Sequence, residues 1–400
     1  MRPVSARALA HAQPSSLLCL SCRLQRRTFA SSSTGPPPKP PPSGIAPLRS
    51  RQLLSVGGPD AAKFLQGMVT TNVLSEDGQS ARQEGCYAAF LNATGRIMHD
   101  IFIYPGRSDF AGGEDSSSFL IEADANEMDR LAKFIKRYKL RAKVNVRKIE
   151  PDEVTVWQAW NDSPDAKELS LPSNDAANIL LKDPRTPDLG YRILQLGDKA
   201  PSIDLDQAPE AAYTIRRYLR GVPEGQDEML REQSLPQESN MDFMNGIDFH
   251  KGCYVGQELT IRTKHRGVVR KRVLPCVIYD QHDAPPESLH YNPEGTGTGT
   301  TATAESLTAD MIPQETSIGR FEKRGRSAGK WLRGVGNVGL GLCRLEIMTG
   351  VTLPGETAAA TFDPAHEFVL DWGEEDARSR VKVKAFVPDW IQAGLDAAKR

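Results

Sequence analysis

Apolar positions in the amino-terminal part of the chain follow two spacings, one typical of strands and one typical of helices. Short apolar runs predict strands at residues 52–56, 87–91 and 97–104. A five-residue segment around Gly95 separates the last two runs, so we expect them to form a hairpin. Apolar residues at helical spacing predict helices within residues 58–68, 124–138 and 211–220. Strands and helices mixed in this way predict an α+β fold.

Alternating apolar and charged residues after Arg141 predict a further, half-exposed strand. It would complete a strand–strand–helix–strand series, which fits a ferredoxin-like unit at about residues 86–200. Within this range, residues 161–188 are polar and contain proline, so we expect them to form a surface excursion.

The carboxyl-terminal part of the chain, residues 273–400, is predicted to be a small β-barrel. Short apolar runs separated by turn signals support this prediction. They lie at residues 273–279, 318–322, 338–347, 357–362 and 381–387. Residues 286–314 are of low complexity around Gly295–Gly299 and predict an insertion without regular structure.

The first 44 residues are predicted to be a targeting segment and a linker. No Asp or Glu occurs before Asp60, whereas five arginines lie within the first 27 residues among Ala, Ser and Leu. This composition is typical of a mitochondrial transit peptide, which predicts a mitochondrial matrix location and cleavage after Phe29. The alternative is a disordered basic tail on a cytosolic protein. Residues 35–43 form a proline tract that predicts a linker.

Composition narrows the function classes. The formal net charge is −1, which gives the whole chain no preference for nucleic acid, and no apolar run predicts membrane insertion. Cys19 and Cys22 lie inside the predicted transit peptide, so we assign them no role. The remaining cysteines are scattered and lack the spacing of a self-contained cluster site. They are Cys86, Cys253, Cys276 and Cys343.

The stretch from Lys251 to Glu258, KGCYVGQE, is the strongest candidate for chemistry. Gly252 and Gly256 allow unusual backbone angles and close approach of a ligand. Cys253 between them offers a nucleophilic or metal-binding sulfur. The structural alternative is a turn that carries a buried cysteine.

Asp100 is the second candidate. On a regular strand it shares a face with the apolar Met98, Phe102 and Tyr104. A buried carboxylate must find donors or take up a proton, and such acids concentrate at functional sites. The alternative is an acid at a sheet edge that accepts from a nearby backbone N–H group.

KGCYVGQE, followed by Thr260, Arg262 and His265-Arg266-Gly267, resembles the signature of the folate-binding YgfZ-type proteins. These proteins are relatives of the glycine-cleavage T-protein, GcvT, and their mitochondrial members act in iron–sulfur cluster assembly. The FLQG segment at 64–67 and the GVPE segment at 221–224 also resemble this family. The resemblance covers about residues 50–148, 211–280 and 317–347. It implies a GcvT/YgfZ-like fold with a discontinuous first domain, a ferredoxin-like second domain and a small carboxyl-terminal barrel, the folate-binding region being residues 45–272.

The resemblance also implies roles for particular residues. Asp100 would lie by the reactive end of a bound tetrahydrofolate, and Glu238 would accept from the amino groups of the pterin. For Glu238 the alternative is an acid that stabilises the turn at Pro236. Further folate-binding candidates are Lys251, Gly252, Tyr254, Gly256, Gln257, Glu258, Arg262 and Arg266.

The densest basic tract after the predicted cleavage site runs from Arg262 to Arg272. It fits a solvated strand pair, an RNA-binding face, or a cradle for the glutamyl tail of folate, which we favour. The lack of interleaved aromatic residues weakens the RNA alternative.

The resemblance implies a late-acting mitochondrial factor that matures [4Fe–4S] proteins of the aconitase and lipoate-synthase types. Cys253, as the catalytic thiol, would ligate a [4Fe–4S] or [2Fe–2S] cluster shared transiently with an A-type iron–sulfur carrier protein. Such a protein is an assembly factor more than a classical enzyme. Two alternatives stay open: a folate-dependent aminomethyl transferase, and an RNA-binding or RNA-modification accessory.

Overall fold

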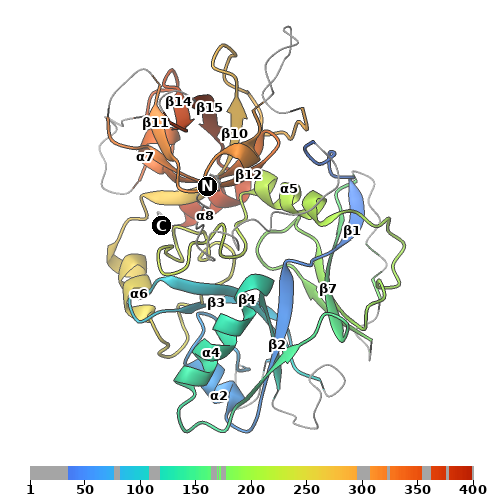
Figure 1. The fold of residues 1–400 in the computed structure, drawn as a ribbon. Coiled ribbons are helices and arrows are strands. Elements are labelled where there is room, and N and C mark those ends of the chain that lie inside the picture. The colour runs from blue at the N-terminus through green and yellow to red at the C-terminus, as the bar shows by residue number, and fades with distance from the viewer. Residues whose placement is uncertain are drawn as a thin grey trace, which may run out of the picture. The chain divides into compact units, whose positions relative to one another are not determined.

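The computed structural model describes ten stretches of the chain, and the statements below concern these residues. They are 35–75, 82–107, 118–163, 169, 171–172, 177–294, 307–321, 325–353, 362–374 and 378–398. The predicted transit peptide, with Cys19 and Cys22, lies outside the described residues. From Pro36 onward the chain forms one compact unit with two antiparallel sheets and a closed barrel (Figure 1). No helix of the described part is long and apolar enough to cross a membrane.

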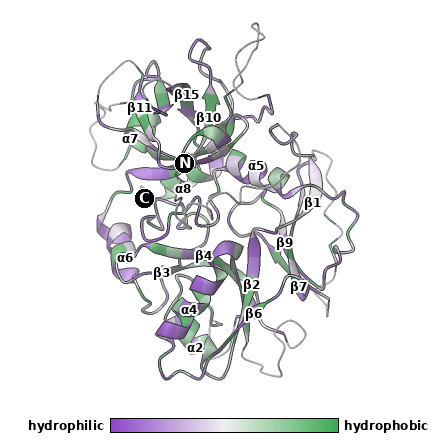
Figure 2. Ribbon diagram, viewed as in Figure 1, coloured by the Kyte–Doolittle hydropathy of each residue, from purple (hydrophilic) through white to green (hydrophobic). Residues whose placement is uncertain are grey.

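The first sheet has five antiparallel strands in the order β3-β4-β5-β2-β6. These strands are β2 (Arg51–Gly57), β3 (Cys86–Leu91), β4 (Ile97–Pro105), β5 (Phe119–Asp124) and β6 (Asn145–Ile149). Helices α2 (Ala61–Gln66) and α4 (Met128–Tyr138, preceded by η1, Ala125–Glu127) bury apolar residues in one core against this sheet. Figure 2 shows hydrophilic residues on the rest of α4.

Strands β2, β4, β5 and β6 with the two helices have the ferredoxin-like order, and β3 extends the sheet at its edge. The sheet is built from residues 51–149, whereas we expected this unit at about 86–200. The predicted hairpin is present as β3 and β4, with a register shift between the pairs at Phe90 and Leu91. This shift places Met98 in the core under the helices rather than on the face of Phe102, which differs from the expected regular alternation.

The second sheet has the order β1-β7-β9-β8. Its strands are β1 (Ser43–Pro47), β7 (Val154–Asn161), β8 (Asn178–Lys182) and β9 (Tyr191–Leu196). A shared core of apolar residues from both sheets, including Phe102 and Trp160, joins it to the first sheet. The expected surface excursion at 161–188 is therefore only partly correct, because it contains β8 and the fully buried Arg185.

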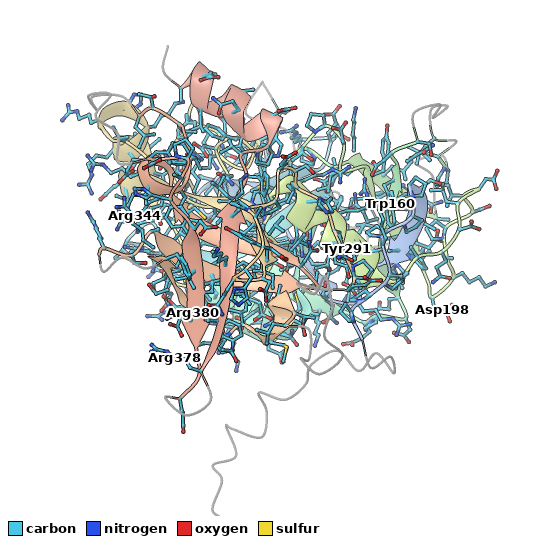
Figure 3. The ribbon with its side chains drawn as sticks, turned by 90° about the horizontal axis from the view of Figure 1, so that it is seen from above. Trp160, Asp198, Tyr291, Arg344, Arg378 and Arg380 are labelled. Atoms are coloured by element: carbon cyan, nitrogen blue, oxygen red, sulfur yellow. The ribbon has the colours of Figure 1, made fainter. Side chains whose placement is uncertain are left out.

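The proline tract at 35–43 packs against the folded unit and does not behave as a free linker. The indole Nε1 of Trp160 donates to the carbonyl of Pro41 over 3.1 Å, and the hydroxyl of Tyr291 donates to the carbonyl of Pro37. Figure 3 labels both of these aromatic residues. Helix α5 (Glu210–Arg220) then leads toward the barrel and ends at Gly221, whose φ of 70° suits a glycine.

The barrel closes in the order β10-β13-β12-β11-β14-β15. Its elements are β10 (Lys271–Tyr279), η2 (Ala309–Met311), β11 (Ser317–Arg320), β12 (Gly329–Val335), β13 (Val338–Arg344), α7 (Leu345–Met348), β14 (Phe368–Trp372), β15 (Ser379–Ala385) and α8 (Asp389–Ala397). Strands β12 and β14 were not predicted, and most of the expected strand at 357–362 lies outside the described residues. Tyr291, Ala309 and Ile312 are buried, so the ends of the expected insertion at 286–314 belong to the folded unit.

Candidate functional site

The loop that carries the signature is anchored through Lys251. Its Nζ donates to the carbonyls of Val69 over 2.6 Å and Thr71 over 3.0 Å, and lies 5.1 Å from the ring centre of Tyr254. Burial lowers the pKa of Lys251 to about 8. The hydrogen bonds of this ammonium go to backbone carbonyls, so its role in the structure is to hold the loop.

The middle of the loop is held by backbone contacts. The N–H of Val255 donates to the carbonyl of Gly67 over 3.0 Å, so the FLQG segment and the signature lie in contact. The N–H of Tyr254 donates to Oε1 of Gln257 over 3.2 Å, which closes the turn before the helix α6 (Gln257–Arg266). Tyr254 itself is buried, and burial raises the pKa of its hydroxyl to about 12.

Gly256 fixes the end of the loop at the first residue before α6. Its φ is 80°, in the left-handed region that side chains rarely adopt. A Cβ on Gly256 would lie 2.3 Å from the carbonyl oxygen of Asn92 and 3.2 Å from Cα of Gly95. The loop therefore packs directly on the turn between β3 and β4.

Cys253 and Gly252 lie on the exposed part of this loop. Of the four cysteines among the described residues, Cys253 is the exposed one. A Cβ on Gly252 would meet nothing within 4 Å. No group of three or more His, Cys, Asp or Glu side chains placed to hold a metal ion occurs in the described ranges.

Asp100 is fully buried on β4. Its Oδ2 accepts from Nη1 of Arg51 over 3.3 Å, and its Oδ1 accepts from the N–H of Gly225 over 3.1 Å. Burial raises the pKa of Asp100, and the nearby Arg51 opposes that shift. The carboxylate has found its donors inside the protein.

Asp100 belongs to a larger buried charge network. Nε of Arg51 donates to Glu122 over 2.9 Å, and Glu122 also accepts from the Tyr104 hydroxyl over 2.7 Å. Glu224, from the GVPE segment, accepts from Arg185, Arg192 and Tyr213, each over 2.7 Å. Burial alone would raise the pKa of Glu224, but the surrounding arginines hold it well below its ordinary value.

This network joins the two sheets to the segment after α5. Sequence reasoning did not find Arg51, Glu122, Arg185 or Arg192. The one available signal was that Arg51 and Glu122 occupy inward positions on otherwise apolar strands.

Glu238 makes different contacts from Asp100. Its side chain is 21% exposed and its Oε1 lies 3.7 Å from Nζ of Lys271, while its carbonyl accepts from the N–H of Val273. Glu238 thus contacts the start of barrel strand β10, whereas Asp100 contacts Arg51 and Gly225.

Arg262 and Arg266 are exposed on α6, as is Glu258 one turn before Arg262. The alternative of a solvated strand pair is therefore wrong as far as Arg266, where the tract is helical. At its end, Arg272 is buried, pairs with Asp242 over 2.9 Å and lies 3.8 Å from the ring centre of Phe243. The basic tract thus contains exposed cations, such as Arg262 and Arg266, and the buried Arg272, which stabilises the fold through its ion pair.

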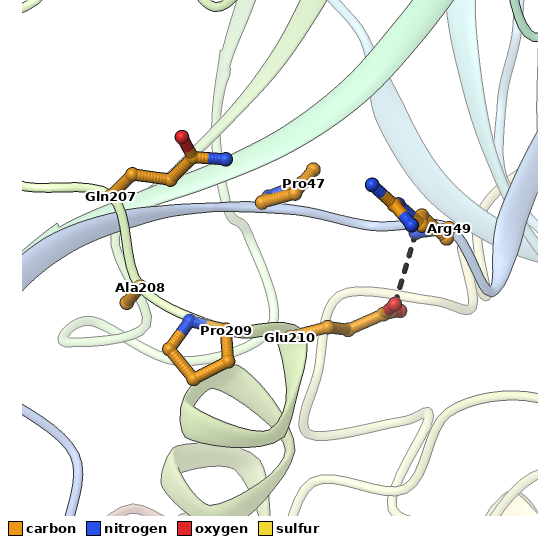
Figure 4. Close-up of a pocket in the computed structure, with 6 residues that line it drawn as sticks. All are labelled: Pro47, Arg49, Gln207, Ala208, Pro209 and Glu210. Carbon is orange, nitrogen blue, oxygen red and sulfur yellow. Dashed lines mark hydrogen bonds between the residues drawn. The ribbon is translucent and has the colours of Figure 1, made fainter. Parts of the chain in front are cut away.

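The structure has a cavity of about 450 Å³ between β1 and the start of α5 (Figure 4). The N–H of Arg49 donates to Oε2 of Glu210 across its rim over 3.0 Å. Its lining residues are Pro47, Arg49, Gln207, Ala208, Pro209 and Glu210. None of the residues that we expected to bind folate lines this cavity.

Comparison with known proteins identifies the family. A family model described as the CAF17 C-terminal beta-barrel domain matches residues 270–393. The iron–sulfur cluster assembly factor IBA57 homolog of Pyricularia oryzae is 56% identical over 363 residues, covering 89% of this chain and 86% of that protein. The chain belongs to the mitochondrial IBA57 family of iron–sulfur cluster assembly factors. The homologs from Chaetomium globosum and Neurospora crassa are 49% and 46% identical, covering 93% and 94% of this chain and 89% and 88% of their own lengths.

The fold is also that of a solved structure. The glycine cleavage system aminomethyltransferase T from Bartonella henselae matches with a TM-score of 0.53 at 11% identity, over 88% of this chain and 86% of that one. The predicted GcvT/YgfZ-like α+β fold with a carboxyl-terminal barrel is confirmed. Membership of the IBA57 family confirms the predicted assembly-factor class and the mitochondrion as its location.

Proposed function

We propose that this IBA57-family protein acts in the mitochondrial matrix in the late maturation of [4Fe–4S] proteins, with Cys253 as one ligand of a cluster shared with an A-type carrier. The observation that carries the proposal is the placement of Cys253. Its thiol is exposed on a loop whose two sides are fixed, by Lys251 on one and Gly256 on the other. A fixed, accessible thiol suits a metal ligand.

One thiol is too few for a cluster, which needs about four cysteine ligands in its common forms. The described residues offer no group of three ligating side chains, and the proposal assigns the other ligands to the carrier. Either a [2Fe–2S] or a [4Fe–4S] cluster would then be cargo held across a contact between two proteins. Enzymes of the aconitase and lipoate-synthase types are the proposed clients.

Anaerobic reconstitution with an A-type carrier tests the ligand role. We expect a cluster that remains with the complex of the wild-type protein, and its loss, or a changed spectrum, with Cys253→Ser. Cys86→Ala is the matched control, because Cys86 is buried and would not be a ligand. In mitochondria that lack the native protein, Cys253→Ser should fold but fail to restore aconitase activity. An unchanged cluster and full restoration by Cys253→Ser would overturn the proposal.

Tetrahydrofolate binding is a separate part of the proposal, supported by the GcvT-like fold. Glu238 is a better partner for the amino groups of a pterin than Asp100, because part of its carboxylate is exposed whereas Asp100 is enclosed by Arg51 and Gly225. Arg262 and Arg266 are accessible to a glutamyl tail. Since Asp100 does not reach the surface, we assign it no chemical step on the folate.

Calorimetry tests this part independently of the cluster. Saturable binding of tetrahydrofolate should weaken in Glu238→Ala and remain in Cys253→Ser. No heat of binding at millimolar folate would remove the ligand while leaving the assembly role standing. Transfer of a one-carbon unit from an aminomethyl donor to the bound folate would instead support the transferase alternative, to which the fold of the Bartonella structure corresponds.

A further inference from the structure

Four cations on α6 and on the segment that follows it in the sequence form no ion pair with a described acidic residue. They are Arg262, Lys264, Arg266 and Arg270, here called the basic face. All four are exposed, and none forms an ion pair with another described residue; the ammonium of Lys264 lies 5.0 Å from the ring centre of Phe249. Arg272, two residues beyond, is by contrast buried and forms an ion pair with Asp242 over 2.9 Å. The basic face therefore takes no part in the ion pairs among the described residues.

The helix explains how these cations gather. Glu258, Arg262 and Arg266 are four residues apart and so share one side of α6. Thr260 is the one buried residue of the helix. A helix with so little buried surface and a single acid among its cations presents a net positive surface to solvent.

The exposed thiol and the basic face belong to one segment of fixed geometry. Gly256 is the residue before α6 and packs on the turn at Gly95, while Lys251 is bound to the carbonyls of Val69 and Thr71. The position of Cys253 relative to Arg262 and Arg266 is therefore set by the fold. A molecule bound to the basic face would meet the thiol in a defined orientation.

Gly252 leaves the backbone beside Cys253 open to close approach by another molecule. Unlike Gly256, it has no positive φ and no neighbouring atom within 4 Å of a Cβ position. Nothing inside the chain thus requires a glycine beside Cys253. Val268, at the other end of α6, leaves an apolar side chain 38% exposed. The open backbone at Gly252, the exposed Val268 side chain and the cations without acidic partners together favour a protein as the binding partner. A nucleic acid would use the cations but not the apolar side chain.

We propose that the basic face is a docking surface for an acidic face of the protein that brings the remaining cluster ligands. It would steer that partner by long-range attraction and orient its ligands over Cys253. The inference rests on the proposed function, since it concerns the partner of the same site. It assigns to Arg262 and Arg266 a role in association rather than in holding the cluster.

Stopped-flow association with an A-type carrier, measured over a range of salt concentrations, tests the docking surface. Arg262→Glu with Arg266→Glu should lower the association rate constant about tenfold at low salt and flatten its salt dependence. The matched control is Lys133→Glu with Arg137→Glu, which reverses two exposed cations at the same spacing on α4. It should associate as the wild type does. Unchanged thermal unfolding in both variants would show that the fold is retained.

Cys253→Ser separates the two proposals. It should associate at the wild-type rate but lose the shared cluster, whereas the α6 variant should associate slowly and then form a cluster with the wild-type spectrum. A normal association rate in the α6 variant, or equal slowing in the α4 control, would overturn the docking surface. So would a loss of affinity for polyglutamyl tetrahydrofolate or RNA in the α6 variant with carrier association unchanged. A normal cluster with Cys253→Ser would overturn the ligand role alone.

Discussion

Gly95 and Gly256 lie in contact, although one belongs to the hairpin turn of the first sheet and the other to the signature loop. A Cβ on Gly95 would lie 2.9 Å from the carbonyl oxygen of Gly256, and both glycines have a φ of 80°. The contact makes the turn a support for the loop that presents Cys253. Two motifs that are separate in the sequence therefore form one surface.

Gly256→Ala should destabilise the protein by about 3 kcal/mol, because a non-glycine residue in the left-handed region is strained and the new Cβ would approach the Asn92 carbonyl to 2.3 Å. The free energy of unfolding in urea measures the loss. Gly252→Ala is the control and should unfold as the wild type does, since its Cβ meets no neighbour. Equal stability of Gly256→Ala and the wild type would show that the contact between the loop and the turn is loose.

The partly buried amine of Lys251 should make stability depend on pH above neutrality. Burial lowers the pKa of Lys251 from 10.5 to about 8 in the folded state. Between these two values the unfolded chain binds more protons than the folded one, so the free energy of unfolding rises with pH from about 8 to about 10.5. Below pH 8 the amine is charged in both states and contributes no slope.

Urea unfolding of the wild type and Lys251→Met at a series of pH values isolates this contribution. The difference in the free energy of unfolding between the two proteins should grow in favour of the wild type above pH 8 and stay level between pH 6 and 7. A difference that does not vary with pH would show that Lys251 is not buried as described. Other titrating groups cancel in the comparison.

Strands β2, β3 and β4 of the first sheet could be predicted because each is a short apolar run, and β6 could be predicted from its alternating pattern, whereas β5 was not predicted. Helix α6 could not, since its single buried residue, Thr260, gives no apolar period that would separate a helix from a polar strand. The same limit hid β12, whose Lys330 and Arg333 interrupt its apolar residues. The signature loop was recognisable from its glycines and cysteine, but its anchoring by Val69 and Thr71 depends on a fold that joins distant segments.

The buried network was the least predictable part of the site. Arg51 and Arg192 lie on strands where a charged residue ordinarily faces solvent, and the acids that pair with them come from β5 and from the segment after α5. Asp100 could be singled out as a carboxylate among apolar neighbours, but its donors could not be. Only the three-dimensional arrangement shows that its charge is balanced internally.

Glu224→Gln should destabilise the protein by about 3–5 kcal/mol, because it removes the buried acid that pairs with both Arg185 and Arg192 and leaves each arginine with one acidic partner, Asp183 or Glu122. The expected loss is a stability effect, seen in urea unfolding whether or not a cluster is bound. Glu315→Gln is the matched control: Glu315 pairs with Lys330 over 2.7 Å, but the two side chains are 39% and 54% exposed. That change should cost less than about 1 kcal/mol. Equal effects of the two substitutions would show that the network is solvated.

Cys253 should be the cysteine of the folded unit that reacts with iodoacetamide in the native protein. Thiolate is the reactive form, and burial raises the pKa of Cys86 to about 11, so at about pH 8 roughly one Cys86 side chain in a thousand would be ionised. Cys276 and Cys343 are fully buried in the barrel, with their sulfur atoms 3.8 Å apart, and the pKa of Cys343 is raised by its contact with Cys276 and by burial.

Peptide mapping by mass spectrometry after brief alkylation distinguishes these four sites. The peptide with Cys253 should be modified within minutes, and those with Cys86, Cys276 and Cys343 only after the protein is unfolded in urea, which serves as the control for reagent access. Prior assembly of the cluster with the carrier should protect Cys253, because its sulfur would then be bound to iron. Rapid native labelling of Cys86 would contradict its burial in the core of the first sheet and would make it a second thiol available to the cluster.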